Sequence, residues 1–158
     1  MATIIICLLA VGYIMEDIPR ENPLHTALYN AHKSFGVTIL LLCLLRIYYR
    51  VRLGVPALPA AIPAIEQKLA HTSHYLFYVL MICQPLSGYL MTNFFGFPVM
   101  FFGIYLPKVV GANKEIAEYF VTIHTIIGYT FVGLIALHVT GALKHYITER
   151  INLFQRMI

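Results

Sequence analysis

Four long apolar stretches dominate this chain and determine the solvent in which it can fold. They cover residues 1–15, about 31–53, about 69–91 and about 119–146. A helix that crosses the hydrocarbon core of a bilayer needs about 20 mostly apolar residues, and here 59% of all residues are hydrophobic while only 11% are charged. The pattern predicts an all-α protein, a four-helix transmembrane bundle, made by a single domain over residues 1–158.

The first apolar stretch is short for a membrane span. Its residues 1–15 would make a helix of about 22 Å, against a hydrocarbon core of about 30 Å. No basic residue precedes it and no small-residue cleavage pattern follows it, so we do not expect a removable signal peptide. We expect the true chain to begin several residues upstream, and a tilted or re-entrant segment is the alternative.

Prolines mark the connections between the apolar stretches. Two prolines interrupt residues 16–30 and three interrupt residues 54–68, so both links are predicted to be extended turnarounds. The third link, residues 92–118, combines phenylalanines and a tyrosine with prolines and glycines. This mixture suits the headgroup zone, and we expect the link to lie on the membrane surface as a cap.

The distribution of charge predicts the orientation. One side collects seven basic residues: Arg46, Arg50, Arg52, Lys68, Lys144, Arg150 and Arg156. The other has four, Arg20, Lys33, Lys108 and Lys114, together with five of the seven acids. Because cytoplasmic segments are enriched in Lys and Arg, the C-terminus of this multi-pass membrane protein is predicted to be cytoplasmic. Basic residues at helix ends suit contact with anionic lipid headgroups. The sequence has no basic stripe with interleaved aromatic residues, so nucleic-acid binding is not expected.

Three of the seven histidines indicate a redox function, because ionisable residues at membrane depth are costly and usually functional. His32 opens the second apolar helix, and His124 and His138 share the fourth. Their separation of 14 residues is nearly four helical turns, which places both on almost one face about 21 Å apart. Facing imidazoles in a helix bundle are typical axial ligands of haem iron.

Topology then predicts which histidines pair. His32 and His124 both lie toward the outer side, so they are expected to hold one b-type haem between them. The alternative is that neighbouring polar groups satisfy both rings. His138 lies toward the cytoplasmic side and needs a partner at similar depth, near the beginning of the first helix, where this sequence has no histidine.

Two basic residues lie near the predicted haems. Arg46 follows His32 by 14 residues and so shares its helical face, where it is a candidate to bind the propionates of the inner haem. A snorkelling arginine is equally consistent with this position. Lys33 is the corresponding candidate for the outer haem.

The other histidines have less specific explanations. His71 and His74 lie one turn apart near the cytoplasmic start of the third helix, and an interfacial hydrogen-bonding role is favoured over a metal pair or a quinone contact. His25 is expected in an outer loop. His145 is expected at the cytoplasmic edge, where a headgroup or quinone contact stays open. Four glycines suit either ordinary helix packing or close approach of a macrocycle: Gly36, Gly128, Gly133 and Gly141.

Four segments together resemble the bacterial dihaem cytochrome b561 family, which includes superoxide oxidases and hydrogenase-type cytochrome b membrane domains. They are NAHKSFGVTILLLCLLRIYYR, LAHTSHYLFYVLMICQPLSGYLM, FFGFPVMFFGIYLP and IHTIIGYTFVGLIALHVTGALKHY. The resemblance covers almost the whole chain. It is specific because the context of His32, the His71 and His74 pair before Pro-Leu-Ser-Gly, and the spacing of His124 and His138 occur in the expected order.

The resemblance implies a cytochrome of the bacterial inner membrane with two b haems that passes electrons between an outer donor, with superoxide as a candidate, and the quinone pool. It also implies that His32 and His124 ligate the outer haem, and that His138 ligates the inner haem with a histidine early in the first helix. That ligand is expected upstream of Met1; a one-haem protein is the competing account. A haem-bearing anchor subunit of a separate dehydrogenase or hydrogenase, and a haem-free transporter or scaffold, are alternative functions.

Overall fold

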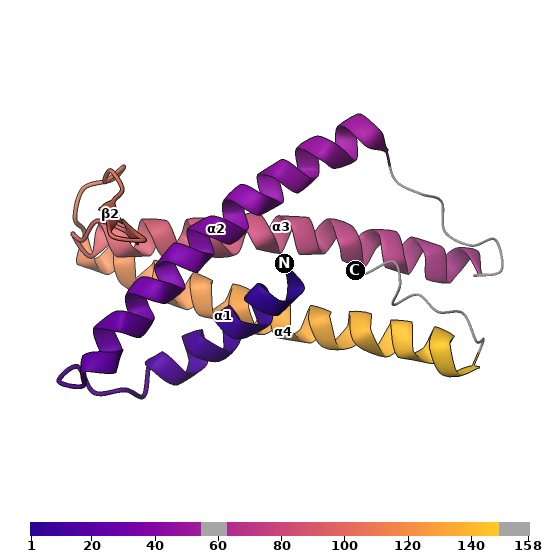
Figure 1. Ribbon diagram of the computed structural model, residues 1–158, viewed down its shortest axis with the longest axis horizontal. Coiled ribbons are helices and arrows are strands. Elements are labelled where there is room, and N and C mark those ends of the chain that lie inside the picture. Colours follow the sequence, from indigo (N-terminus) through magenta and orange to yellow (C-terminus); the bar gives the residue numbers. More distant parts are fainter. Residues whose placement is uncertain (55–62, 149–158) are drawn as a thin grey trace.

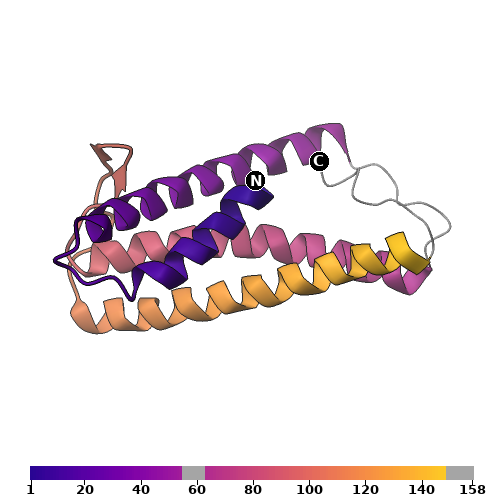
Figure 2. The ribbon, with the colours of Figure 1, turned by 60° about the horizontal axis from the view of Figure 1, so that its bottom comes forward.

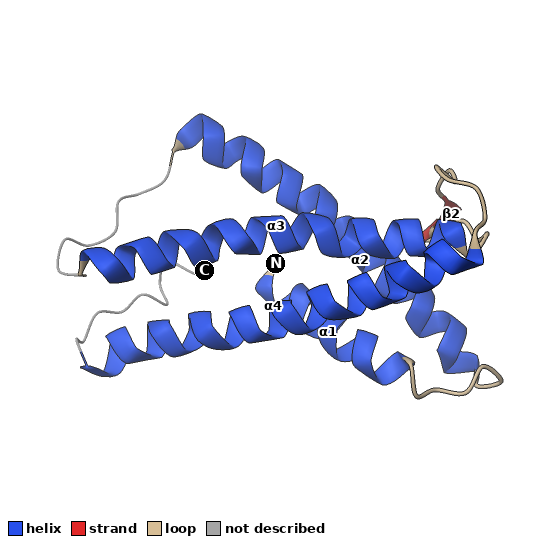
Figure 3. Cartoon of the chain, turned by 180° about the vertical axis from the view of Figure 1, so that it is seen from behind, coloured by secondary structure: helices blue, strands red, loops and turns tan. Residues whose placement is uncertain are grey.

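The computed structural model describes residues 1–54 and 63–148, in which four helices form an all-α bundle (Figures 1 and 3). The helices are α1 (Ala2–Met15), α2 (Pro23–Leu53), α3 (Ala64–Phe94) and α4 (Lys114–Thr148). Of these, α2, α3 and α4 are long and apolar enough to cross a membrane. Helix α1 has 14 residues, which is shorter than the about 20 that a perpendicular span requires.

Helices α3 and α4 run side by side, and α2 crosses them obliquely, while α1 lies beside the first half of α2 (Figures 1 and 2). The small core where they meet comprises Ile39, Cys43, Met81 and Phe131. Only 17%, 17% and 11% of the most apolar windows of α2, α3 and α4 are buried inside the protein. Many of the remaining large apolar side chains are exposed on the outside of the bundle, as on a surface that faces lipid.

Helix α2 begins earlier than predicted, so the expectation of an extended link over residues 23–30 is wrong. Asn22 caps the helix, because its side-chain oxygen accepts a hydrogen bond from the Leu24 amide at 3.0 Å. Pro23 occupies the first helical turn, where a missing N–H costs nothing. Consequently His25 lies in a helix rather than in an outer loop, and His32 lies in its third turn rather than at its start.

Helix α3 also begins earlier than predicted. Pro63 is its N-terminal cap, and residues 64–68 are helical instead of extended, again because proline is tolerated where a helix begins. Residues 55–62 of the predicted turnaround, and the C-terminal tail with Arg150 and Arg156, lie outside the described residues.

The link between α3 and α4 contains a short hairpin that the all-α prediction did not include. Strands β1 (Met100–Phe101) and β2 (Ile104–Tyr105) pair antiparallel. The two turn residues, Phe102 and Gly103, have φ of 46° and 93°, as a type I′ turn requires. Ser34 of α2 fastens the hairpin, because its hydroxyl oxygen accepts a hydrogen bond from the Phe102 amide at 3.0 Å. The hairpin thereby covers one end of the bundle.

Candidate functional site

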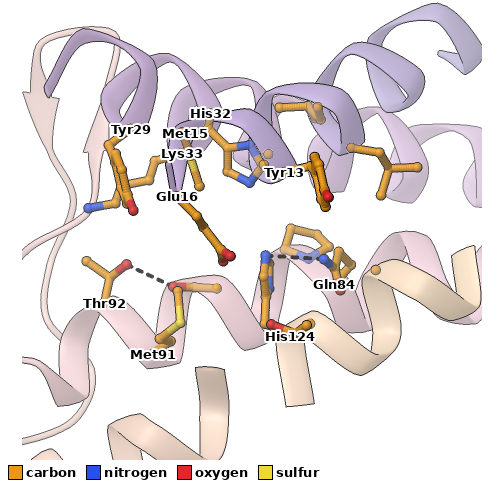
Figure 4. Close-up of a pocket in the computed structure, with 18 of the residues that line it drawn as sticks. Tyr13, Met15, Glu16, Tyr29, His32, Lys33, Gln84, Met91, Thr92 and His124 are labelled. Carbon is orange, nitrogen blue, oxygen red and sulfur yellow. Dashed lines mark hydrogen bonds between the residues drawn. The ribbon is translucent and has the colours of Figure 1, made fainter. Parts of the chain in front are cut away.

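A cavity of about 1190 Å³ opens at the hairpin end of the bundle and is lined by residues of all four helices (Figure 4). His32 enters it from α2 and His124 from α4. Their ring centroids are 6.3 Å apart, and the ring planes are inclined by 71°. The structure therefore brings together the two histidines that topology paired, although 92 residues separate them in the sequence.

The geometry of this pair fits a metal held between two imidazoles. Imidazole nitrogen binds zinc at about 2.0–2.1 Å, and two rings bound on opposite sides of a metal at such distances have centroids roughly 6 Å apart. In addition, His32 Nδ1 is buried without a hydrogen-bond partner, which a buried polar atom rarely tolerates. The donor set and the cavity together suit a flat macrocycle with two axial ligands.

Two glycines make room for the rings. A Cβ atom at Gly12 of α1 would lie 3.2 Å from His32 Cε1, and one at Gly88 of α3 would lie 3.0 Å from His124 Cε1. Gly36 also lines the cavity, and a Cβ atom there would meet nothing within 4 Å. The positions of the two histidines thus depend on small residues in neighbouring helices, whereas the space in front of Gly36 is open.

Polar side chains of α3 hold the ring of His124. Ser87 Oγ lies 2.9 Å from His124 Nδ1, and Gln84 Nε2 lies 3.2 Å from His124 Nε2 (Figure 4). Ser87 is 5% exposed, and Gln84 Oε1 is buried without a hydrogen-bond partner. Sequence reasoning did not single out either residue, because nothing local in a helical stretch reveals a contact 37 or 40 residues away.

Charged residues surround the outer part of the cavity. Lys33, Arg20 and Glu16 line it, and Figure 4 shows the Glu16 side chain pointing into the cavity. Lys33 thus lines the same cavity as the two histidines. Two other basic residues of the expected outer side do not line this cavity: Lys108 donates a hydrogen bond to the Gly96 carbonyl at 3.4 Å, and Lys114 lies 3.9 Å from Glu118.

His138 lies in the other half of the bundle, against side chains of α3. Its ring centroid is 5.3 Å from that of His74 and 5.2 Å from that of Phe77. On the neighbouring helix α2, Arg46 Nε donates a hydrogen bond to the Tyr78 hydroxyl at 3.2 Å. The structure thus places His138 beside His74, while α1 contributes no histidine to this region.

The basic end of the bundle contains an ionic cluster that sequence reasoning missed. Glu66 of α3 accepts hydrogen bonds from Lys144 Nζ at 2.6 Å and faces His145 Nε2 at 2.9 Å. His145 is 8% exposed, whereas His71 is exposed. Only the packing of α3 against α4 brings Glu66 to these residues, which follow it by 78 and 79 positions.

Within the described ranges, no three or more His, Cys, Asp or Glu side chains gather as a metal-chelating group. The donors that the helices bring together are pairs of histidines. A pair suits a metal whose remaining coordination positions are supplied by a cofactor, as in haem.

Comparison with known proteins agrees with this geometry. The family model described as "Prokaryotic cytochrome b561" matches residues 1–158. The "Probable superoxide oxidase CybB" of Yersinia pestis is 30% identical over 128 residues, which are 80% of this chain and 72% of the relative. The "Cytochrome b561 homolog 2" of Escherichia coli (strain K12) is 25% identical over 99% of this chain and 84% of its own length. "Cytochrome b561 homolog 1" of the same organism is 27% identical over 89% and 80%.

Proposed function

Because the chain belongs to the prokaryotic cytochrome b561 family, we propose that it binds two b haems and carries electrons from an outer donor to membrane quinone. The family supports a b-type haem protein of a bacterial membrane with a role in electron transfer. The observation that carries the proposal for the outer site is the pair of His32 and His124, whose ring centroids lie 6.3 Å apart across the cavity.

His32 and His124 are the proposed axial ligands of the outer haem, and His138 is a proposed ligand of the inner one. Bound haem would supply an iron that accepts and releases one electron at a time. Lys33, which lines the cavity beside His32, is proposed to bind a propionate of the outer haem through a charge-assisted hydrogen bond. Arg46 is proposed for the same role at the inner haem, where it would exchange its contact with Tyr78 for the propionate.

Superoxide is the proposed outer donor. One superoxide anion loses one electron and becomes dioxygen; two such electrons and two protons convert a quinone to a quinol. Lys33 and Arg20 line the cavity and would attract an anion toward it, while Glu16 opposes them. The relative named as a probable superoxide oxidase adds support for this donor.

The proposed orientation follows the positive charges. The bundle gathers Arg46, Arg50, Arg52, Lys68 and Lys144 toward the end away from the hairpin. We place this end and the C-terminus on the cytoplasmic side of the inner membrane, since Lys and Arg concentrate there. The hairpin end, with the His32 and His124 pair, then faces the outer side.

Reduced-minus-oxidised spectra of the purified full-length protein test the haem assignment. His32→Ala and His124→Ala should each remove the outer haem and leave the inner one, whereas His71→Ala, an exposed histidine of α3, should change neither. Wild-type protein without a b-type α band would contradict the proposal. Loss of both haems from a folded His32→Ala variant would contradict the pairing.

The donor needs a separate assay. Superoxide generated in the presence of the purified protein and a short-chain ubiquinone should reduce the quinone, and His124→Ala should abolish that reduction. Wild-type protein that holds haem but shows no such reduction would exclude superoxide as the donor. That result would favour the alternative of a haem-bearing subunit that serves a separate dehydrogenase.

A further inference from the structure

We infer that Ser87 is a positioning residue that sets the tautomer of His124 and strengthens it as an axial ligand of the outer haem. This inference rests on the proposed function, because it takes His124 to be a haem ligand. It also gives a physical role to the Ser-Gly part of the Pro-Leu-Ser-Gly segment in α3, residues 85–88.

The hydrogen bonds around Ser87 determine which partner donates. The serine hydroxyl carries one hydrogen atom, and it lies 2.8 Å from the carbonyl oxygen of Gln84, to which it donates. The lone pairs of Ser87 Oγ then accept, so at 2.9 Å the donor is the Nδ1–H of His124. The proton of the neutral ring is therefore on Nδ1.

The other side of the ring agrees with this tautomer. Because Nδ1 carries the proton, Nε2 has a free lone pair, and Gln84 Nε2 donates to it at 3.2 Å. An unprotonated Nε2 is the nitrogen that can bind iron. The amide of Gln84 thus occupies the position of a metal, and its own Oε1 is buried without a partner. Gln84 would have to leave Nε2 when haem binds.

The surroundings make the contact of Ser87 specific. Ser87 is 5% exposed, so water competes little for its hydroxyl. The next residue, Gly88, lies so close to the ring that a Cβ atom would be 3.0 Å from His124 Cε1 and 3.3 Å from His124 Nδ1. Ser87 therefore binds the ring while Gly88 gives it space, and the two adjacent residues fix both its orientation and its tautomer.

A hydrogen bond from the second ring nitrogen raises the basicity of a histidine ligand, and losing such a partner typically costs about 10–100-fold in metal affinity. A more basic ligand favours ferric over ferrous iron. Ser87→Ala should therefore lower the ratio of ferric to ferrous affinity by about tenfold, which for a one-electron couple raises the midpoint potential of the outer haem by about 59 mV.

The test is a redox titration of the purified holoprotein, with electron paramagnetic resonance of the ferric outer haem as a second readout. Ser87→Ala should show the upward shift and altered g values, and Ser87→Thr, which keeps the hydroxyl, should restore wild-type behaviour. The matched control is Ser73→Ala, because Ser73 is also in α3 and also donates to a carbonyl three residues earlier, at 2.9 Å, while in the described part of the chain no hydrogen bond joins its side chain to a histidine. It should change neither readout.

Ser87→Cys keeps the approximate volume and weakens the hydrogen bond, so it covers the case in which alanine disturbs folding. Loss of the outer haem in the cysteine variant but not in the threonine variant supports the inference. Unchanged potential and g values in both Ser87→Ala and Ser87→Cys would overturn it, and so would loss of the haem from the threonine variant as well. Wild-type protein without an outer haem would instead refute the proposed function.

Discussion

Gly88 lies beside a proposed haem ligand with no room for a larger side chain. Replacing it with alanine should affect haem binding more than the stability of the fold. The added Cβ atom would lie 3.0 Å from His124 Cε1. Carbon atoms pack best at about 3.5–4.0 Å, so the ring must move by about 0.5 Å or more. That displacement already reaches the tolerance of about 0.5 Å within which a functional constellation must be held.

The effect on the fold should be small. Alanine is more favourable than glycine in a helix by about 0.8–1.0 kcal/mol, which offsets part of an overpacking cost of about 1–3 kcal/mol. The net loss of unfolding free energy is then between near zero and about 2 kcal/mol. The effect on the binding of the outer haem should be larger than the effect on stability. We expect a loss of about 10–100-fold in haem affinity, or about 1.4–2.7 kcal/mol of binding free energy.

The measurement is the affinity of Gly88→Ala for the outer haem, from the Soret absorbance during haem titration, with g values from electron paramagnetic resonance, in a His138→Ala background that isolates the outer haem. Gly133→Ala is the matched control, because Gly133 is also helical and a Cβ atom there meets nothing within 4 Å. The control should bind outer haem as the parent protein does. Equal affinity and equal g values in the two alanine variants would refute the claim that the ring of His124 needs the space left by Gly88.

Three further predictions concern the cavity, the cap and the basic end. Gly36→Leu should leave folding intact but exclude the outer haem, because Gly36 lines the cavity and faces open space; an unchanged outer-haem spectrum would show that haem does not enter there. Asn93→Ala should destabilise the cap by about 1–3 kcal/mol and speed proteolysis of the link, since the fully buried Asn93 Oδ1 accepts from the Val109 amide at 2.8 Å; unchanged proteolysis would contradict this. Glu66→Gln should lower the thermal unfolding temperature in detergent, because it removes the carboxylate that faces His145; an unchanged temperature would assign the cluster no role in stability.

The approximate positions of the helices were predictable, because a segment that crosses the membrane must be a long run of mostly apolar residues. The spacing of His124 and His138 likewise follows from the helical repeat alone. The helix starts were misjudged at Pro23 and Pro63, where proline was interpreted as a helix breaker although the first turn of a helix accepts it. A proline is compatible both with a break in a helix and with its first turn. For α2, the capping side chain of Asn22 favours the second role.

The support around the proposed ligands was not predictable, because it depends on contacts between helices rather than on periodicity within one. A serine in an apolar helix reads as a small residue that bonds to its own backbone, and Ser73 and Ser87 look alike in this respect. Only the position of α4 against α3 gives Ser87 the ring of His124 as a second partner. Gly12 is similar, since its role depends on α1 lying beside α2 at His32.

The two histidine pairs differ in how well the described residues suit them to hold a metal between the two rings. His32 and His124 have space between them, with centroids 6.3 Å apart, and a serine and glycines that fix their rings. His138 and His74 have centroids only 5.3 Å apart and lie on helices that pack side by side. Two imidazoles that share a metal need centroids roughly 6 Å apart, so the rings of His74 and His138 would have to move apart by roughly 0.7 Å for His74 to serve as the second ligand. For the proposed inner haem, the described residues therefore favour a second ligand from another direction, and His74 is better suited to pack against His138 than to bind iron with it.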